Sequence, residues 1–158
     1  MADSVVLDRG VRADPRLEIT LRATRECQSI IGDVIESFLK AELDRRGCRS
    51  LLHDALFALQ EAIGNVVRHA YRDRADAGPI HVRADVLPHL LQISVADEGP
   101  GYDPQGVPEP DFSRPLDGGF GLHLMRATMS KVAYMRRGRR NVLLMEKVLA
   151  AEASEDSG

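Results

Sequence analysis

Two glycine-rich stretches carry residue types that suit a bound ligand. In residues 97–101, Asp97-Glu98-Gly99-Pro100-Gly101, a carboxylate stands at the end of an apolar run. There it can accept a hydrogen bond from a buried ligand amine. Gly99 and Gly101 free the backbone for a positive φ or for a close approach to the ligand. Taken alone, the stretch is equally compatible with a plain turn.

The second stretch is typical of a phosphate-binding helix start. It comprises Gly118, Gly119, Phe120, Gly121 and Leu122 and opens an expected helix. Glycines at this place expose backbone N–H groups where the helix dipole favours an anion, so phosphate is the natural ligand. A flexible hinge is the alternative. No Gly-Lys-Ser/Thr follows, which excludes a Walker A loop.

A third set of polar residues has helical spacing. Glu61, Asn65 and His69 recur every four residues, with Arg68 beside them, so they share one stripe of a helix. A lone Glu–Asn pair would indicate only a solvated helix face. The two glycine stretches favour a site instead, although for His69 we expect a structural contact.

These residues depend on a helix that the apolar pattern predicts over residues 51–71. Ser50 is its expected N-cap, and Asp54 adds a negative charge to the first turn. A preceding helix runs from a Thr24 cap to Gly47.

The rest of the chain predicts a sheet. Alternating or apolar runs indicate strands at residues 16–21, 80–86, 90–96, 131–135 and 141–149, and a third helix covers 120–129. Helices gathered on one face of a mixed, mostly antiparallel sheet form a two-layer α/β (α+β) sandwich. We expect a tail or loose leading strand at 1–14, the domain at 15–149 and a disordered acidic tail at 150–158.

Composition narrows the function further. The 158 residues carry a formal net charge of -3 and no tryptophan, so nothing favours nucleic acid or an anionic membrane. The two cysteines, Cys27 and Cys48, lack metal-ligand spacing and indicate reduced thiols. We find no signal peptide and no membrane-spanning run, and expect a cytoplasmic protein.

Together, the three stretches resemble the Bergerat-fold (GHKL) ATPases, a superfamily that includes gyrase, mismatch-repair ATPases and histidine kinases. Two motifs are most similar to those of the histidine-kinase-like anti-sigma-factor serine/threonine kinases. They are Glu61-Ala62…Asn65…His69-Ala70-Tyr71 and residues 97–103. The resemblance covers about residues 17–149.

The resemblance implies a role for each motif residue. Asn65 would coordinate Mg²⁺ on the ATP phosphates, because a carboxamide oxygen suits that hard cation. Asp97 would bind the adenine amino group, with the backbone at Gly99 and Gly101 close to the base. Glu61 would be the general base that takes a proton from an attacking hydroxyl. The residues expected on the phosphate side are Arg114, Gly118, Gly119, Phe120, Gly121 and Leu122, next to an ATP lid at residues 103–118.

The sequence departs from that family at two places. The basic residue expected before the second glycine stretch is replaced by Leu116 and Asp117, and the nearest cation is Arg114. The family's Gly-Thr near the last strand is replaced by Arg140-Asn141, which implies that a phosphate-side hydroxyl is absent.

The resemblance predicts an ATP-dependent serine/threonine kinase that phosphorylates a small anti-sigma-antagonist protein and sequesters a sigma factor, acting as a homodimer. The main alternative is a non-catalytic switch in which ATP sets partner affinity. A detached histidine-kinase catalytic domain ranks third, because we recognise no histidine-bearing helical hairpin before Leu17. A folded domain without nucleotide binding ranks fourth.

Overall fold

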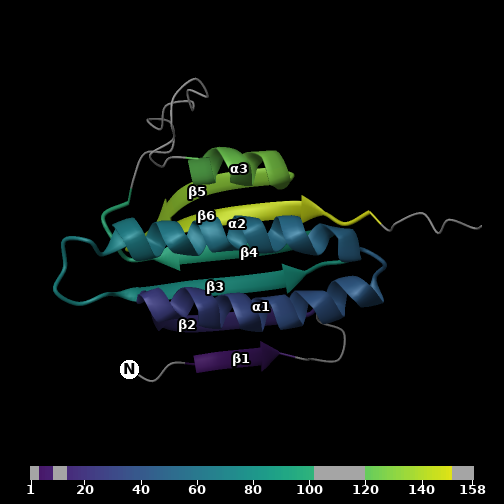
Figure 1. Ribbon diagram of the computed structural model, residues 1–158, viewed down its shortest axis with the longest axis horizontal. Helices are drawn as coiled ribbons and strands as arrows, with labels where there is room; N and C mark the ends of the chain where they lie inside the picture. Colours follow the sequence, from purple (N-terminus) through teal and green to yellow (C-terminus); the bar gives the residue numbers. More distant parts are fainter. Residues whose placement is uncertain (1–3, 9–13, 102–119, 151–158) are drawn as a thin grey trace, which may run out of the picture.

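The computed structural model describes residues 4–8, 14–101 and 120–150, and within them the chain forms a sheet layer and a helix layer (Figure 1). The elements follow in this order: β1 (Ser4–Asp8), β2 (Arg16–Arg22), α1 (Arg25–Arg45), a 3-10 turn (Arg49–Leu51), α2 (Leu52–Asn65), a π turn (Val66–Ala70), β3 (Pro79–Val86), β4 (Leu90–Asp97), α3 (Phe120–Thr128), β5 (Lys131–Arg137) and β6 (Arg140–Val148).

The six strands form one sheet in the order β1-β2-β3-β4-β6-β5. Each described pairing is antiparallel, and α1, α2 and α3 all cover the same face. The predicted two-layer sandwich is therefore confirmed, with a described sheet that is antiparallel throughout. Residues 4–8, expected in a tail or a loose leading strand, pair with β2 as β1.

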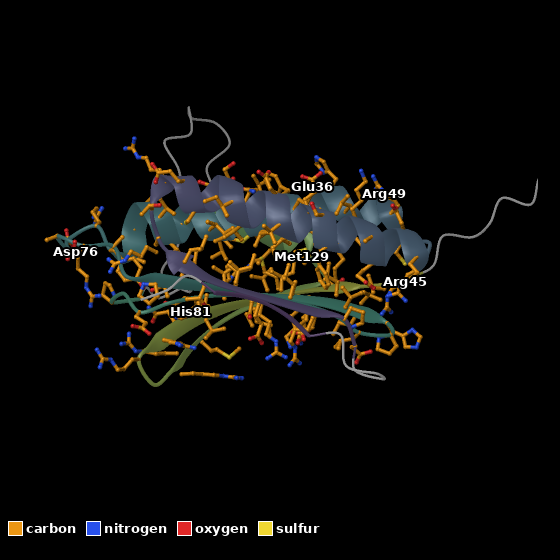
Figure 2. The ribbon with its side chains drawn as sticks, turned by 90° about the horizontal axis from the view of Figure 1, so that it is seen from below. Glu36, Arg45, Arg49, Asp76, His81 and Met129 are labelled. Carbon is orange, nitrogen blue, oxygen red and sulfur yellow. The ribbon has the colours of Figure 1, made fainter. Side chains whose placement is uncertain are left out.

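The core follows the alternation read from the sequence. Alternate positions of each central strand face the helices, and those of β4 include the buried Leu91, Ile93 and Val95. Figure 2 shows Met129 in the layer between helices and sheet, whereas Glu36 and Arg49 lie on the outer side of the helices. Burying one apolar face from each layer provides the main driving force for this fold.

The ends of the first two helices differ in how well the sequence predicted them. Thr24 is the N-cap residue of α1, as predicted, and Gly47 follows its end with φ of 65°. The prediction of Ser50 as the cap of α2 is wrong, because Leu51 holds that position. The 3-10 turn at Arg49–Leu51 runs directly into α2, so the backbone at Leu51 is already helical and has no extended cap residue.

The predicted single helix over residues 51–71 is also interrupted. Regular α-helix ends at Asn65 and continues as the π turn Val66–Ala70. The wider turn changes the helical spacing, and His69, expected to make a structural contact, is exposed. The π turn therefore separates His69 from the stripe that Glu61 and Asn65 share.

Candidate nucleotide-binding site

The candidate residues gather at one end of the molecule. β4 ends there, the π turn follows α2 there, α3 begins there, and the β5–β6 hairpin returns there (left in Figure 1). The antiparallel pairing of the strands and the direction of α2, opposite to that of β3, bring these sequence-distant segments to a common edge. The two layers thus position polar side chains that are more than 30 residues apart in sequence.

Asp97, the last residue of β4, lies in a hydrogen-bonded cluster. Its Oδ1 accepts hydrogen bonds from the backbone N–H of Gly99 at 2.8 Å and from Nδ2 of Asn141 at 2.9 Å. Asn141 is directly opposite Asp97 in the β4–β6 pairing and is only 1% exposed. Asn141, which stands in the pair that replaces the family's Gly-Thr, therefore contacts the carboxylate expected to bind the base.

The two glycines after Asp97 are each required by the structure, for different reasons. Gly101 adopts φ of 81°, and a Cβ there would lie 2.7 Å from Oδ1 of Asn141. At Gly99 a Cβ would overlap the backbone carbonyl oxygen of Ala70, in the π turn. The close approach predicted at Gly99 is thus made by the protein's own backbone, and it holds the Asp97 loop against the end of α2.

Tyr71 fixes the same loop from the helix side. Its hydroxyl donates a hydrogen bond to the carbonyl of Pro79 at 2.6 Å and accepts one from the N–H of Glu98 at 2.8 Å. Burial raises the pKa of this phenol, so it keeps its proton. Tyr71 belongs to the motif that carries the family resemblance, but no role was predicted for it. The glycine at position 78 is the sequence feature that fits this packing, because any Cβ there would overlap the tyrosine ring.

Glu61 lies on α2 against the first turn of α3. A Cβ at Gly121 would stand 2.6 Å from Oε2 of Glu61. The carboxylate predicted as a general base and the second glycine stretch are therefore neighbours in space. Leu122, next along α3, has its side chain in the core and is 7% exposed, so only its backbone can face a ligand.

Asn65, one turn beyond Glu61, has a partner within its own helix region. Nη2 of Arg68 donates a hydrogen bond to Oδ1 of Asn65 at 3.2 Å. That oxygen is the one a Mg²⁺ ion would need. Among the described residues, no group of three or more His, Cys, Asp or Glu side chains is placed to hold a metal. One amide oxygen fits Mg²⁺, which keeps several waters and takes its other ligands from substrate phosphates.

The remaining predicted residues lie partly beyond this description. Arg114, Gly118 and Gly119 fall outside the described residues, as does the expected lid. Phe120 is the first residue of α3, and its side chain is likewise outside them. The structure thus gives positions for only part of the predicted set, and the role of every residue in that set stays a prediction.

The fold is similar to those of two solved structures. The RsbU and RsbW domains of Rv1364c from Mycobacterium tuberculosis superpose with a TM-score of 0.61 at 23% identity, over 87% of this chain and 34% of that one. The histidine kinase domain of the blue-light activated kinase EL346 from Erythrobacter litoralis gives a TM-score of 0.51 at 18% identity, over 76% and 60%. At these identities the likeness shows a shared fold and nothing further.

Sequence comparison gives the family. The model of the histidine kinase-like ATPase domain matches residues 31–147, and the chain belongs to that family. The serine/threonine-protein kinase BtrW of Bordetella bronchiseptica is 35% identical over 97 residues, which are 59% of this chain and 68% of that protein. The serine-protein kinase RsbW of Bacillus licheniformis is 35% identical over 89 residues, 51% of this chain and 55% of that protein. The match thus spans little more than half the length of that RsbW.

Among the described helices, none is both long and apolar enough to cross a bilayer.

Proposed function

We propose that this domain binds ATP with Mg²⁺, transfers the γ-phosphoryl group to a serine or threonine of a small anti-sigma-antagonist protein, and sequesters a sigma factor as a cytoplasmic homodimer. Relatives at 35% identity carry the names of serine and serine/threonine kinases, which supports the transfer reaction. The observation that carries the proposal is the position of Glu61, a carboxylate held against the glycine that opens α3.

The proposal assigns the two ends of the nucleotide to different elements. Asp97 accepts a hydrogen bond from the adenine amino group, and the backbone at Gly99 and Gly101 lies beside the base. Asn65 supplies an oxygen to Mg²⁺, which neutralises phosphate charge when bound. The start of α3 offers free N–H groups to the phosphates, because the first turn of a helix has no internal acceptors for them.

Glu61 acts on the partner's hydroxyl group. Its carboxylate takes the hydroxyl proton while the hydroxyl oxygen bonds to the γ-phosphorus. The bond from that phosphorus to the bridging oxygen breaks, and ADP leaves. The products are a phosphoserine or phosphothreonine on the partner and a protonated Glu61.

Replacing Glu61 with alanine tests this assignment. We expect Glu61→Ala to lower label transfer from ATP to a purified antagonist by about 10²–10⁴-fold, since general-base catalysis contributes about that much. Mg-ATP affinity, measured by isothermal titration, should stay close to that of the unmodified protein. Glu36→Ala, an exposed carboxylate on α1, is the matched control and should change neither quantity. Unchanged transfer in Glu61→Ala would remove Glu61 from the mechanism.

A non-catalytic switch is the second candidate function. It is favoured by Leu116 and Asp117, which stand where the family carries a cation before the second glycine stretch. In that case ATP would change the affinity for the partner, and no label would move in the unmodified protein. A flat titration with Mg-ATP at high protein concentration would contradict both functions and favour an inert domain.

A further inference from the structure

The carboxamide of Asn141 is buried between three segments of the site. Besides its bond to Asp97, Nδ2 of Asn141 donates to the carbonyl oxygen of Gly99 at 2.9 Å. Its Oδ1 accepts a hydrogen bond from Nη1 of Arg136 at 3.3 Å, and the same guanidinium nitrogen donates to the carbonyl of Pro100 at 3.0 Å. β6, β5 and the loop after β4 are thereby joined through one side chain.

These contacts permit only one orientation of the amide. The NH₂ group faces two oxygens that can only accept, on Asp97 and Gly99, and the amide oxygen faces a guanidinium that can only donate. A flipped amide would place oxygen against oxygen at 2.9 Å and nitrogen against Arg136. Both protons of the NH₂ group are therefore committed.

This arrangement decides what remains free on Asp97. Oδ1 is occupied by Asn141 and by the backbone of Gly99, and the carboxylate plane is fixed from two sides. Within the described part of the chain, no hydrogen bond reaches Oδ2. A fixed carboxylate with one open oxygen accepts an N–H donor and repels another acceptor.

We infer that Asn141 is a positioning residue that aims Asp97 at the amino group of a 6-aminopurine and sets the preference for that base over a 6-oxopurine. The inference rests on the proposed nucleotide site, and it concerns which base the site prefers. A 6-oxopurine carries an oxygen where adenine carries its amine, so it would meet Oδ2 acceptor to acceptor. Arg136 holds the amide of Asn141 in place from the outer strand.

The test compares three ligands by isothermal titration: ATP, inosine triphosphate and inorganic triphosphate. In Asn141→Asp the new carboxyl faces Asp97, so two carboxylates compete at hydrogen-bond distance. We expect the preference for ATP over inosine triphosphate to fall by about tenfold or more, as loss of a hydrogen bond to a charged group implies. Affinity for inorganic triphosphate, which has no base, should stay the same.

The pH profile separates positioning from a general structural effect. Two carboxylates that share one site raise the pKa of one of them, and the protonated carboxyl can again donate to Asp97. The ATP preference of Asn141→Asp should therefore recover as the pH falls from 8 to about 5.5. Asn141→Thr keeps one donor, so it should show an intermediate preference without this pH dependence. Equal losses for all three ligands, or an unchanged ratio, would overturn the inference.

A milder variant covers the case in which the buried substitution prevents folding. Arg136→Gln removes the guanidinium from the exposed side, and Arg137→Gln on the same strand is its matched control. We expect a reduced ATP preference only in Arg136→Gln, and equal ratios in both variants would count against the inference. If the unmodified protein binds none of the ligands, the proposed function itself fails, which is a different result.

Discussion

Tyr71 links two segments of the candidate site, a role that its motif does not indicate. Its hydroxyl bonds both to the start of β3 and to the residue after Asp97. Its ring lies on Gly78, and Arg74 stacks over it with the guanidinium carbon 5.5 Å from the ring centroid. The sequence shows an aromatic residue at the end of a helix, but it cannot show which backbone groups the hydroxyl will reach.

Removing that hydroxyl isolates its contribution. We expect Tyr71→Phe to lower the free energy of unfolding by about 1–3 kcal/mol, because the buried N–H of Glu98 and carbonyl of Pro79 lose their partner. ATP affinity should fall too, since Asp97 is the neighbour of Glu98. Urea denaturation and nucleotide titration measure the two effects. A variant as stable as the parent would show that water replaces the hydroxyl.

At the scale of elements, sequence periodicity predicted most of the fold. The alternation of polar and apolar residues predicted the strands because each strand has one face on the core and one face outside, as in β3 and β4. Local rules failed where neighbouring elements decide the outcome. The 3-10 turn before α2 displaced the expected cap at Ser50, and the π turn removed His69 from its stripe. The partner of Asp97 was missed because Asn141 meets it only through strand register, which no local pattern records.

Two glycines of the candidate site lie against different kinds of atoms. At Gly121 an added methyl group meets the end of the flexible Glu61 side chain, whereas at Gly99 it meets the rigid backbone of Ala70. Gly121→Ala should therefore fold nearly as well as the parent while phosphoryl transfer falls by about tenfold or more, since a base displaced by 1 Å loses much of its effect.

Gly99→Ala should show the opposite pattern. Backbone cannot yield as a side chain does, so we expect a loss of stability of about 1–3 kcal/mol. Thermal unfolding together with label transfer distinguishes the two variants. Equal stability losses in both would mean that Glu61 is as rigidly held as the backbone of Ala70.

For the whole molecule, acid stability depends on a buried charge on the side of the sheet away from the helices. Asp85 is 4% exposed and accepts hydrogen bonds from Nε of Arg16 at 2.5 Å and from Nε of Arg83 at 2.6 Å. Burial alone would raise the pKa of Asp85, but the bonds from Arg83 and Arg16 outweigh it and hold the pKa below its ordinary value. This cluster joins β2 to β3 across the sheet.

The sign of the pH effect follows from that shift. Because the pKa is lower in the folded state, the ionised carboxylate adds stability above the unfolded value, and this is lost as the pH falls through the folded value. Asp85→Asn should cost about 2 kcal/mol at neutral pH and should weaken the pH dependence of unfolding between about pH 5 and pH 2. Asp76→Asn, in an exposed loop (Figure 2), is the control. If the free energy of unfolding fell as steeply with decreasing pH in Asp85→Asn as in the control, other carboxylates would be responsible for the acid sensitivity.

The register of β6 against β4 determines which side chain faces Asp97. Only the register that sets Asn141 opposite Asp97 turns the carboxamide inward. A slip by a single position would turn Asn141 to the opposite face and bring Arg140 or Val142 to the carboxylate. An insertion in the short turn at Gly138 and Arg139 that shifted this register would thereby replace the amide beside Asp97 with a cation or a methyl group. Under the proposed function, hairpin length would therefore be a second route, besides substitution, to a changed preference for the base.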